Sequence, residues 1–259
     1  MDIITSRHNP LIVETAKLRD KKYRDAARLF PADGRKLFRE AAAAIPDAIQ
    51  RVFVTPEFYE ENKNELLNFN VTVVSTPIFE KISPESSPEG VVCVLRYIDF
   101  FHNYITIYNA SQKGERIFAA HEVRDPGNLG TIIRTAFAFG YDRLLLSDCA
   151  DIYNPKTVRA AMGALFRMKI TICTDMAGSL DALRREGRMV YAAALDRDAR
   201  PLDTMPPDPD AVYLVGNEGH GLPDSLIAHT DGTVFIPIAA ESESLNAAIA
   251  AAVLLWHNR

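Results

Sequence analysis

The pattern of hydrophobic and polar positions in the first hundred residues predicts a small α/β unit. Leu11, Ile12 and Leu18 recur at helical spacing, with Pro10 suited to a first turn, which predicts a helical arm over residues 9–29. Helices are then expected over 34–45 and 56–69, and strands over 49–55, 71–75 and 90–97. Residues 83–89 are typical of a loop, and 100–113 have no clean period.

From residue 116 the pattern changes to short apolar runs, most of them followed by a helical stretch. Such runs of four to seven apolar residues are typical of a parallel sheet covered on both faces. The expected strands are residues 117–123, 141–147, 168–173, 189–195, 212–215 and 233–238, and the expected helices include 155–166 and one that begins at Leu245. The sequence thus predicts an α/β protein with two domains, residues 1–103 and 116–259, joined by a linker over 104–115.

Composition and charge narrow the class of protein. With 47% hydrophobic residues the chain can bury a sizeable core, and the three cysteines lie far apart, as expected of buried side chains in a reducing compartment. The longest apolar run, 247–256, is too short to span a bilayer, so we expect no membrane segment and a cytoplasmic protein. The net charge of −5 argues against a protein that coats nucleic acid, but residues 1–40 hold ten Lys and Arg against six Asp and Glu. A solvated helix face explains that excess equally well.

Three segments at expected strand ends carry the candidate chemistry. In residues 121–136 an Asp-Pro-Gly turn leads into a helix with Asn128 as a suitable N-cap and Arg134 beside small residues. In residues 212–223 three glycines surround Glu218, and glycine lets the backbone approach a ligand. In residues 235–249 Pro237 interrupts a strand before Ser244, which we expect to cap the last helix. Taken singly, each segment also fits a purely structural role.

Several common sites are absent from the sequence. The glycine spacings fit neither a dinucleotide fingerprint nor a P-loop, although Asp148 stands where the ribose-binding acid of a dinucleotide site would stand. The six histidines show no H-x-x-x-H or H-E-x-x-H pair, so no metal site is expected, and no G-x-S-x-G elbow occurs.

Together and in this order, the three segments resemble the motifs of the SpoU (TrmH) family of RNA ribose 2′-O-methyltransferases in the SPOUT superfamily. The resemblance lies in residues 128–136 (NLGTIIRTA), 214–222 (LVGNEGHGL), 236–238 (IPI) and 243–246 (ESLN). Residues 155–166 are similar to a stretch that these enzymes carry between the first two motifs, and residues 4–10 and 34–35 to the small RNA-binding domain in front. The resemblance covers nearly the whole chain.

The resemblance implies a fold, a cofactor and an assembly. It implies a C-terminal SPOUT domain with a trefoil knot and a parallel sheet, preceded by a small α/β RNA-binding domain with a ribosomal-protein-like fold. It also implies a homodimer that completes each active site, and S-adenosylmethionine as cofactor, with no metal. The residues implied to hold the cofactor are Leu214, Val215, Gly216, Ile236, Ile238 and Leu245.

The same resemblance assigns the catalytic residues. Arg134 is implied to act on the ribose hydroxyl, and Asn128, Glu218, Ser244 and Asn246 to position it and the substrate. Because an arginine stays protonated at neutral pH, we expect Arg134 to align the oxygen and to work with an RNA phosphate or Glu218. The basic arm is then expected to contact RNA phosphates through Arg7, Lys17, Arg19, Lys21, Lys22, Arg24 and Arg35.

The resulting hypothesis is methyl transfer to a ribose 2′-hydroxyl of structured RNA, with ribosomal RNA favoured over transfer RNA because of the accessory domain. Transfer RNA stays open as a substrate. A non-catalytic RNA-binding protein that keeps the fold is the second hypothesis, against which the five polar residues Asn128, Arg134, Glu218, Ser244 and Asn246 argue. A nucleotide-dependent oxidoreductase is a third, supported by Asp148 alone. Cofactor binding separates the three.

Overall fold

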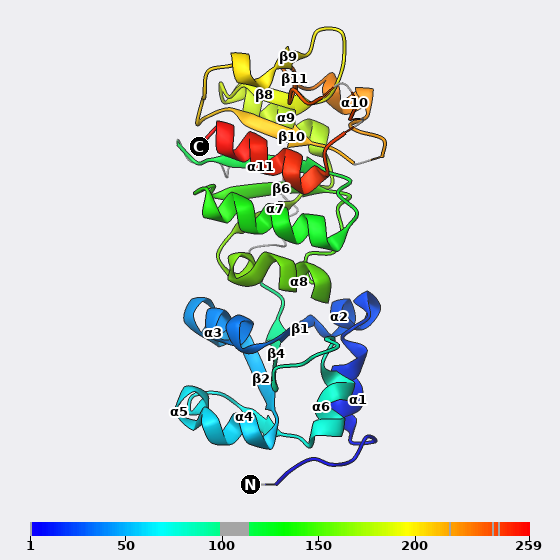
Figure 1. Ribbon diagram of the computed structural model, residues 1–259, viewed down its shortest axis with the longest axis vertical. Coiled ribbons are helices and arrows are strands. Elements are labelled where there is room, and N and C mark those ends of the chain that lie inside the picture. Colours follow the sequence, from blue (N-terminus) through cyan, green and yellow to red (C-terminus); the bar gives the residue numbers. More distant parts are fainter. Residues whose placement is uncertain (1, 99–113, 218, 240, 243) are drawn as a thin grey trace. The chain divides into compact units, whose positions relative to one another are not determined.

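The computed structural model describes residues 2–98, 114–217, 219–239, 241–242 and 244–259 (Figure 1). The contacts between residues divide the chain into two compact units. The first unit consists of residues 1–98 together with 151–166, and the second holds the rest of the described chain. The predicted linker over 104–115 falls largely outside the described residues, and the predicted domain limits stay predictions.

A four-stranded sheet forms the centre of the first unit, in the order β1-β4-β2-β3. Its strands are β1 (Leu29–Asp33), β2 (Ile49–Val54), β3 (Val71–Val73) and β4 (Val91–Arg96). β4 is antiparallel to β1 and β2, whereas β2 and β3 are parallel. The hydrophobic pattern did not predict β1. This strand contains Pro31 and lies at the edge of the sheet, where a missing backbone donor is tolerated.

Among the helices of residues 2–98, the predicted ones are shorter than expected, and the helix at Thr76–Ile82 was not predicted. The helices are α1 (Pro10–Lys17), α2 (Lys21–Ala27), α3 (Arg35–Ala44), α4 (Pro56–Glu61), α5 (Lys63–Leu66) and α6 (Thr76–Ile82), with a 3-10 turn at Pro46–Ala48. The single arm predicted over 9–29 is wrong, because the chain leaves the helix after Leu18 and Arg28 adopts a left-handed conformation (φ 57°) that turns it into β1. Buried side chains of α1 and α6, including Ile12 and Phe79, pack against Phe53 of the sheet.

Residues 151–166 fold as part of the first unit although they lie between two strands of the second in the sequence. They form α8 (Pro155–Ala161) and a 3-10 helix, η4 (Met162–Phe166). The Tyr153 ring stacks on Tyr97 with centroids 3.9 Å apart and lies 4.6 Å from the Phe30 ring. The predicted helical structure over 155–166 is therefore confirmed. The sequence pattern did not indicate that this segment packs on the first unit.

A seven-stranded sheet forms the second unit, and it is parallel throughout, as the alternation of strands and helices predicted. Six of its strands were predicted, and the short strand at Arg200–Pro201 was not. The strand order is β7-β6-β5-β10-β8-β11-β9. The strands are β5 (Ile117–His121), β6 (Arg143–Ser147), β7 (Lys169–Ile172), β8 (Val190–Ala193), β9 (Arg200–Pro201), β10 (Val212–Val215) and β11 (Gly232–Phe235).

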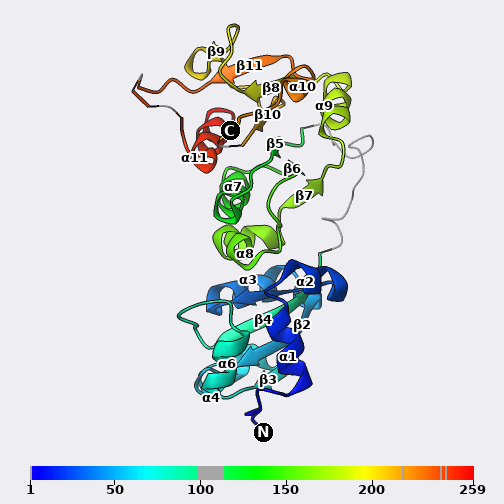
Figure 2. The same ribbon diagram turned by 90° about the vertical axis from the view of Figure 1, so that its right-hand side faces the viewer.

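Helices cover both faces of this sheet: α7 (Pro126–Ala138) and α11 (Ala247–His257) lie on one side and α9 (Met176–Arg185) on the other (Figure 2). The short helix α10 (Asp224–Ile227) packs with α9. Alternate strand residues face opposite layers, so Ala119 and Leu214 join Leu180 of α9 in one buried cluster. Among the described residues no helix is long and apolar enough to cross a membrane.

Candidate active site

The three candidate segments follow strands of the second sheet, and all three lie at the side where the carboxyl ends of the strands meet. β5, β10 and β11 are parallel to β8 or to one another, so their carboxyl ends lie on the same side. β10 is next to β5, and β8 separates β10 from β11. Open parallel sheets bind ligands at this edge, which makes it the candidate site.

The first segment begins α7 at a different residue from the one predicted. The Asp125 side chain accepts a hydrogen bond from the Asn128 backbone N–H at 2.9 Å, and Pro126 is the first helical residue. Asp125 is therefore the N-cap, and the prediction of Asn128 in that role was wrong because two Asx side chains compete within one turn. Asn128 instead sits in the first turn with its side chain half-buried, and Arg134 follows on the same helix with an exposed side chain.

Asn217 organises the second segment, and the sequence reasoning missed it. Its Nδ2 donates to the Glu122 carbonyl oxygen at 3.0 Å, just beyond the end of β5. Its Oδ1 accepts from the backbone N–H groups of Gly219 at 2.8 Å and His220 at 3.2 Å. The side chain thus ties the loop after β10 to the loop after β5. An Asn between two glycines favours such a turn, which is the signal that could have found it. Glu218, a predicted catalytic residue, lies outside the described residues.

Gly216 is needed where β10 enters this loop. Asn217 and Gly221 form an antiparallel bridge with N–H···O distances of 3.2 and 3.0 Å, which folds the chain back on itself. A Cβ added at Gly216 would lie 2.6 Å from the Gly221 carbonyl oxygen, closer than such atoms approach. The backbone here forms a tight cradle that only a residue without a side chain allows. Leu214 and Val215, which precede it, are buried in β10.

The third segment leaves β11 earlier than predicted. The strand ends at Phe235, so Pro237 lies beyond the strand and interrupts no ladder. The residue that caps α11 is Asn246, whose Oδ1 accepts from the Ala248 and Ile249 N–H groups at 2.9 and 3.3 Å. The predicted cap, Ser244, is exposed two residues earlier. Of the predicted cofactor residues in this segment, Ile236 and Leu245 are half-buried and Ile238 is 38% exposed.

One hydrogen bond joins the first and third segments directly. Asn246 Nδ2 donates to Asn128 Oδ1 at 3.1 Å, across 118 residues of sequence. Asn246 Oδ1 accepts the hydrogen bonds that cap α11, so both the oxygen and the nitrogen of this side-chain amide have partners. The fold therefore determines the orientation of the amide. With the Asn217 bond to Glu122, the structure brings all three segments to one place. It places Asn128 and Asn246 in direct contact, whereas the catalytic roles that the resemblance implies for them stay predictions.

The basic arm predicted to bind RNA is mostly solvent-exposed. Arg7, Lys17, Arg19, Lys21 and Lys22 all have exposed side chains. Lys21 pairs with Asp25 one helical turn later at 2.5 Å. Arg35 approaches Glu61 at 3.5 Å and stacks over the Phe58 ring, with Glu89 accepting from its backbone N–H at 2.8 Å. These two carboxylates make Arg35 a weaker candidate for a phosphate contact.

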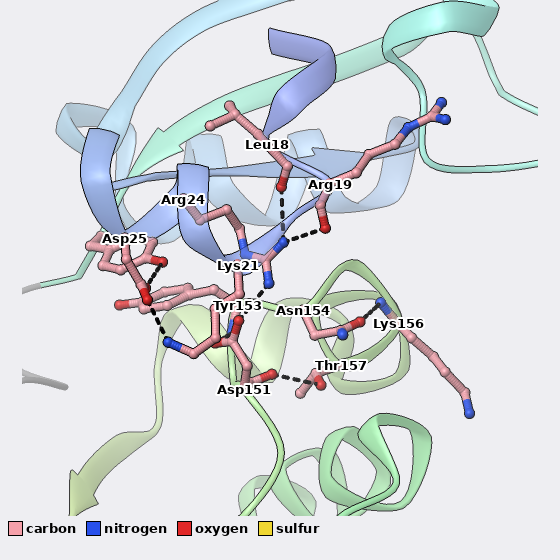
Figure 3. Close-up of polar contacts among 11 residues, drawn as sticks. Leu18, Arg19, Lys21, Arg24, Asp25, Asp151, Tyr153, Asn154, Lys156 and Thr157 are labelled. Carbon is pink, nitrogen blue, oxygen red and sulfur yellow. Dashed lines mark hydrogen bonds and ion pairs between the residues drawn. The ribbon is translucent and has the colours of Figure 1, made fainter. Parts of the chain in front are cut away.

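Arg24 was expected to contact RNA, and the structure contradicts this, because its side chain is 1% exposed. Figure 3 shows its guanidinium between the backbone carbonyls of Leu18 and Arg19 and the carboxylate of Asp151. The donors lie 2.9, 2.6 and 2.6 Å from these three acceptors. A phosphate cannot reach a buried guanidinium that is already paired, so Arg24 is a structural residue of the first unit.

The three cysteines are free thiols whose burial favours the protonated form. Cys93 and Cys173 are buried and Cys149 is partly buried. Burial raises the pKa of Cys149 to about 12 and raises those of Cys93 and Cys173, which keeps the thiols protonated at neutral pH. Within the part of the chain that the structure describes, no group of three or more His, Cys, Asp or Glu side chains is placed to hold a metal ion.

The structure is an α/β protein with an open parallel sheet and a candidate ligand site at the carboxyl ends of its strands. Comparison with known proteins gives the family. A model described as the SpoU rRNA Methylase family matches residues 115–256. One described as the MRM3-like substrate binding domain matches residues 9–93. The chain belongs to the SpoU rRNA methylase family.

Similar proteins match over the whole length of the chain. The 23S rRNA (guanosine(2553)-2'-O)-methyltransferase RlmP of Bacillus subtilis (strain 168) is 31% identical over 260 residues, 100% of both chains. The crystal structure of an AdoMet-bound rRNA methyltransferase from Sinorhizobium meliloti is 31% identical, covers 100% of this chain and 97% of its own, and has a TM-score of 0.84. The structure of a putative RNA methyltransferase of the TrmH family from Porphyromonas gingivalis is 29% identical, covers 96% of this chain and 96% of its own, and has a TM-score of 0.77. The SPOUT fold is confirmed, whereas the trefoil knot stays a prediction.

Proposed function

We propose that this protein transfers a methyl group from S-adenosylmethionine to a ribose 2′-hydroxyl of ribosomal RNA. The observation that carries the proposal is the hydrogen bond between Asn128 and Asn246, which joins two segments of the family pattern at the ligand-binding edge of the sheet. The full-length similarity to the B. subtilis 23S rRNA 2'-O-methyltransferase supports both the reaction and the class of RNA.

The residues at this edge fit S-adenosylmethionine. Gly216 has no side chain to block the backbone of the loop after β10, and Ile236, Ile238 and Leu245 of the third segment are apolar residues that are half-buried or exposed. Similarity to the AdoMet-bound S. meliloti enzyme supports the same cofactor. When bound, S-adenosylmethionine supplies an activated methyl group on a sulfonium centre. Leu214, Val215 and Gly216 with the three residues above would hold it.

The chain's own groups must then orient the ribose. A ribose hydroxyl is too weak an acid to ionise unaided near neutral pH, so a positioned charge that stabilises the developing oxyanion speeds the reaction. Arg134 is exposed on α7, the helix that Asn128 and Asn246 fix at its first turn. We assign to Arg134 the contact with the ribose hydroxyl, and to Glu218 the role of acidic partner of Arg134. The substrate would be positioned by Asn128, Ser244 and Asn246.

Methyl-labelled S-adenosylmethionine tests the proposal directly. The purified protein is incubated with unmodified total RNA and, separately, with 23S rRNA, and labelled nucleotides are mapped as 2′-O-methyl ribose. Label at one ribosomal position is the expected result. Label found only in a transfer RNA would show that the substrate is transfer RNA and not ribosomal RNA. Failure to bind S-adenosylmethionine in calorimetry would leave a non-catalytic RNA-binding protein instead.

Substituting Gly216 tests the assigned cofactor cradle. We expect Gly216→Ala to weaken S-adenosylmethionine binding about tenfold or more, because its Cβ would collide with the Gly221 carbonyl 2.6 Å away and push the loop outward. Gly219→Ala is the matched control in the same loop, since a Cβ there meets its nearest atom, Asn217 Oδ1, at 3.4 Å. Titration calorimetry with both variants decides. Equal affinities for the two would remove Gly216 from the cofactor site.

The protein is also proposed to act as a homodimer through α7 and α11. α11 carries apolar side chains on all sides, and its Ile249 and Trp256 are 53% and 52% exposed, with Phe137 of α7 at 42%. α7 and α11 pack on each other, so these residues belong to one pair of helices. Exposed apolar side chains that gather on packed helices are typical of an interface between copies.

A charge placed on α11 should separate the copies. We expect Ile249→Asp to change the mass measured by light scattering from twice that of one chain to that of one chain, because a desolvated carboxylate opposes association. The control is Leu67→Asp in the first unit, an exposed leucine (76%) outside this helix pair, which should leave the mass unchanged. A wild-type mass of one chain would refute the dimer itself.

A further inference from the structure

A groove of about 550 Å³ lies between α1, α2 and the sheet of the first unit. Its floor is apolar and includes Leu29, Phe53 and Val94 from three strands of the sheet. Phe53 and Val94 belong to the buried cluster under α1, and Leu29 packs against it, so the floor is fixed by the core. The groove therefore belongs to the first unit alone and involves none of the residues assigned to methyl transfer.

The rim of the groove is polar and carries more positive than negative charge. Lys17 and Arg51 line it together with one carboxylate, Glu14. Arg51 Nη1 donates to Thr72 Oγ1 at 2.7 Å and to Asn70 Oδ1 at 3.2 Å. These acceptors are neutral, so they hold the guanidinium in place without cancelling its charge. An anionic ligand is favoured at such a rim.

Tyr23 supplies an aromatic face at the mouth of the groove. Its side chain lines the groove and is 37% exposed, so part of the ring is accessible to a ligand. The Lys17 and Lys22 ammonium groups lie 5.4 and 5.7 Å from the ring centroid. The Tyr23 ring, the Lys17 ammonium group and the Arg51 guanidinium thus line the apolar groove, with Lys22 beside the ring. Proteins hold single-stranded nucleotides in this manner, with a base stacked on an aromatic ring and phosphates on Lys or Arg.

We propose that this groove binds one unpaired nucleotide of the RNA substrate, with its base stacked on Tyr23 and its phosphates contacted by Lys17 and Arg51. The proposal rests on the proposed function for the presence of RNA, and adds a subsite in the first unit that recognises a single-stranded part of that RNA. The substrate is accordingly RNA that has an unpaired base in addition to the methylated ribose. Stacking is tolerant of sequence, so this subsite selects an exposed base and not its identity.

Three tyrosine variants test the subsite. Tyr23→Ala should raise the KM for RNA about tenfold, as expected for loss of one stacked base, and leave kcat and S-adenosylmethionine affinity within twofold of wild type. Tyr23→Phe keeps the ring and should behave as wild type. The control is Tyr59→Ala, because Tyr59 also has a lysine over its ring, Lys63 at 5.7 Å, and lies outside the groove. An unchanged KM for Tyr23→Ala, or an equal rise for Tyr59→Ala, would overturn the proposal.

Salt dependence separates stacking from charge. Lys17→Met should lower RNA affinity and reduce the slope of log affinity against log salt by about one, because one phosphate contact is lost. Tyr23→Ala should lower affinity with the slope unchanged, since stacking releases no counterions. If Tyr23→Ala changed the slope as Lys17→Met does, the groove would be a charge surface only. Wild-type protein that binds S-adenosylmethionine but methylates no RNA would instead count against the proposed function, independently of Tyr23.

Discussion

Arg134→Ala is expected to lower the rate of methyl transfer at saturating RNA and cofactor by about a thousandfold. The size follows from the loss of a positioned charge that acts on the reacting hydroxyl in the transition state, which typically contributes 10²- to 10⁴-fold. S-adenosylmethionine affinity should stay within twofold, because Arg134 lies on α7 and not on the Gly216–Gly221 loop. Transfer of label to RNA under single-turnover conditions measures the chemical step.

Two further variants decide how Arg134 acts. Arg134→Lys keeps the charge but loses the planar fork of donors, so we expect it to recover little of the lost rate. Arg185→Ala on α9, the helix on the opposite face of the sheet, is the matched control and should be fully active. If Arg134→Ala bound RNA and turned over near the wild-type rate, the assignment of Arg134 would be wrong. If it lost only RNA affinity, Arg134 would be a binding residue without a part in the chemical step.

The sequence predicted the second unit well because its signals are local. Buried strands of a parallel sheet are continuous apolar runs, and glycines or Asx residues mark the turns at their carboxyl ends. The three segments were therefore found at the correct edge of the sheet. Errors arose where two residues compete for one role within a turn. Asp125 and Asn246 cap α7 and α11, where Asn128 and Ser244 were expected. Residue type alone cannot rank such neighbours.

The first unit was predicted less well because its decisive contacts join distant residues. β1 is a short edge strand recognised by its pairing with β4, which begins more than fifty residues later. Arg24 was read as one more cation of a basic arm, although its partner, Asp151, lies 127 residues away. Periodicity and charge counts contain no information on such pairs. The burial of a charged side chain can be predicted only when the position of its partner in the fold is known.

Removal of either partner of the Arg24–Asp151 pair should destabilise the protein by about 3–5 kcal/mol, because each single change leaves one charge buried without compensation. Arg24 is 1% exposed and Asp151 14%, and Asp151 also accepts from the Tyr153 N–H at 2.9 Å. We therefore expect Arg24→Met and Asp151→Ala both to shift the urea midpoint strongly downward. The matched control is Arg39→Met. Arg39 makes two contacts with Glu65, at 2.9 and 2.7 Å, but solvent screens that pair, so little change is expected.

The double variant Arg24→Met with Asp151→Leu distinguishes an ion pair from simple packing. If the cost of each single change comes from an unpaired buried charge, replacement of both residues by apolar ones removes that cost, and the double variant should be more stable than either single variant. The same pair holds residues 151–166, including the stacked Tyr153, on the first unit. Hydrogen exchange at α8 should therefore speed up in the single variants and return toward wild type in the double variant. Additive losses in stability would show instead that Arg24 and Asp151 contribute separately, and that the carbonyls of Leu18 and Arg19 hold the guanidinium on their own.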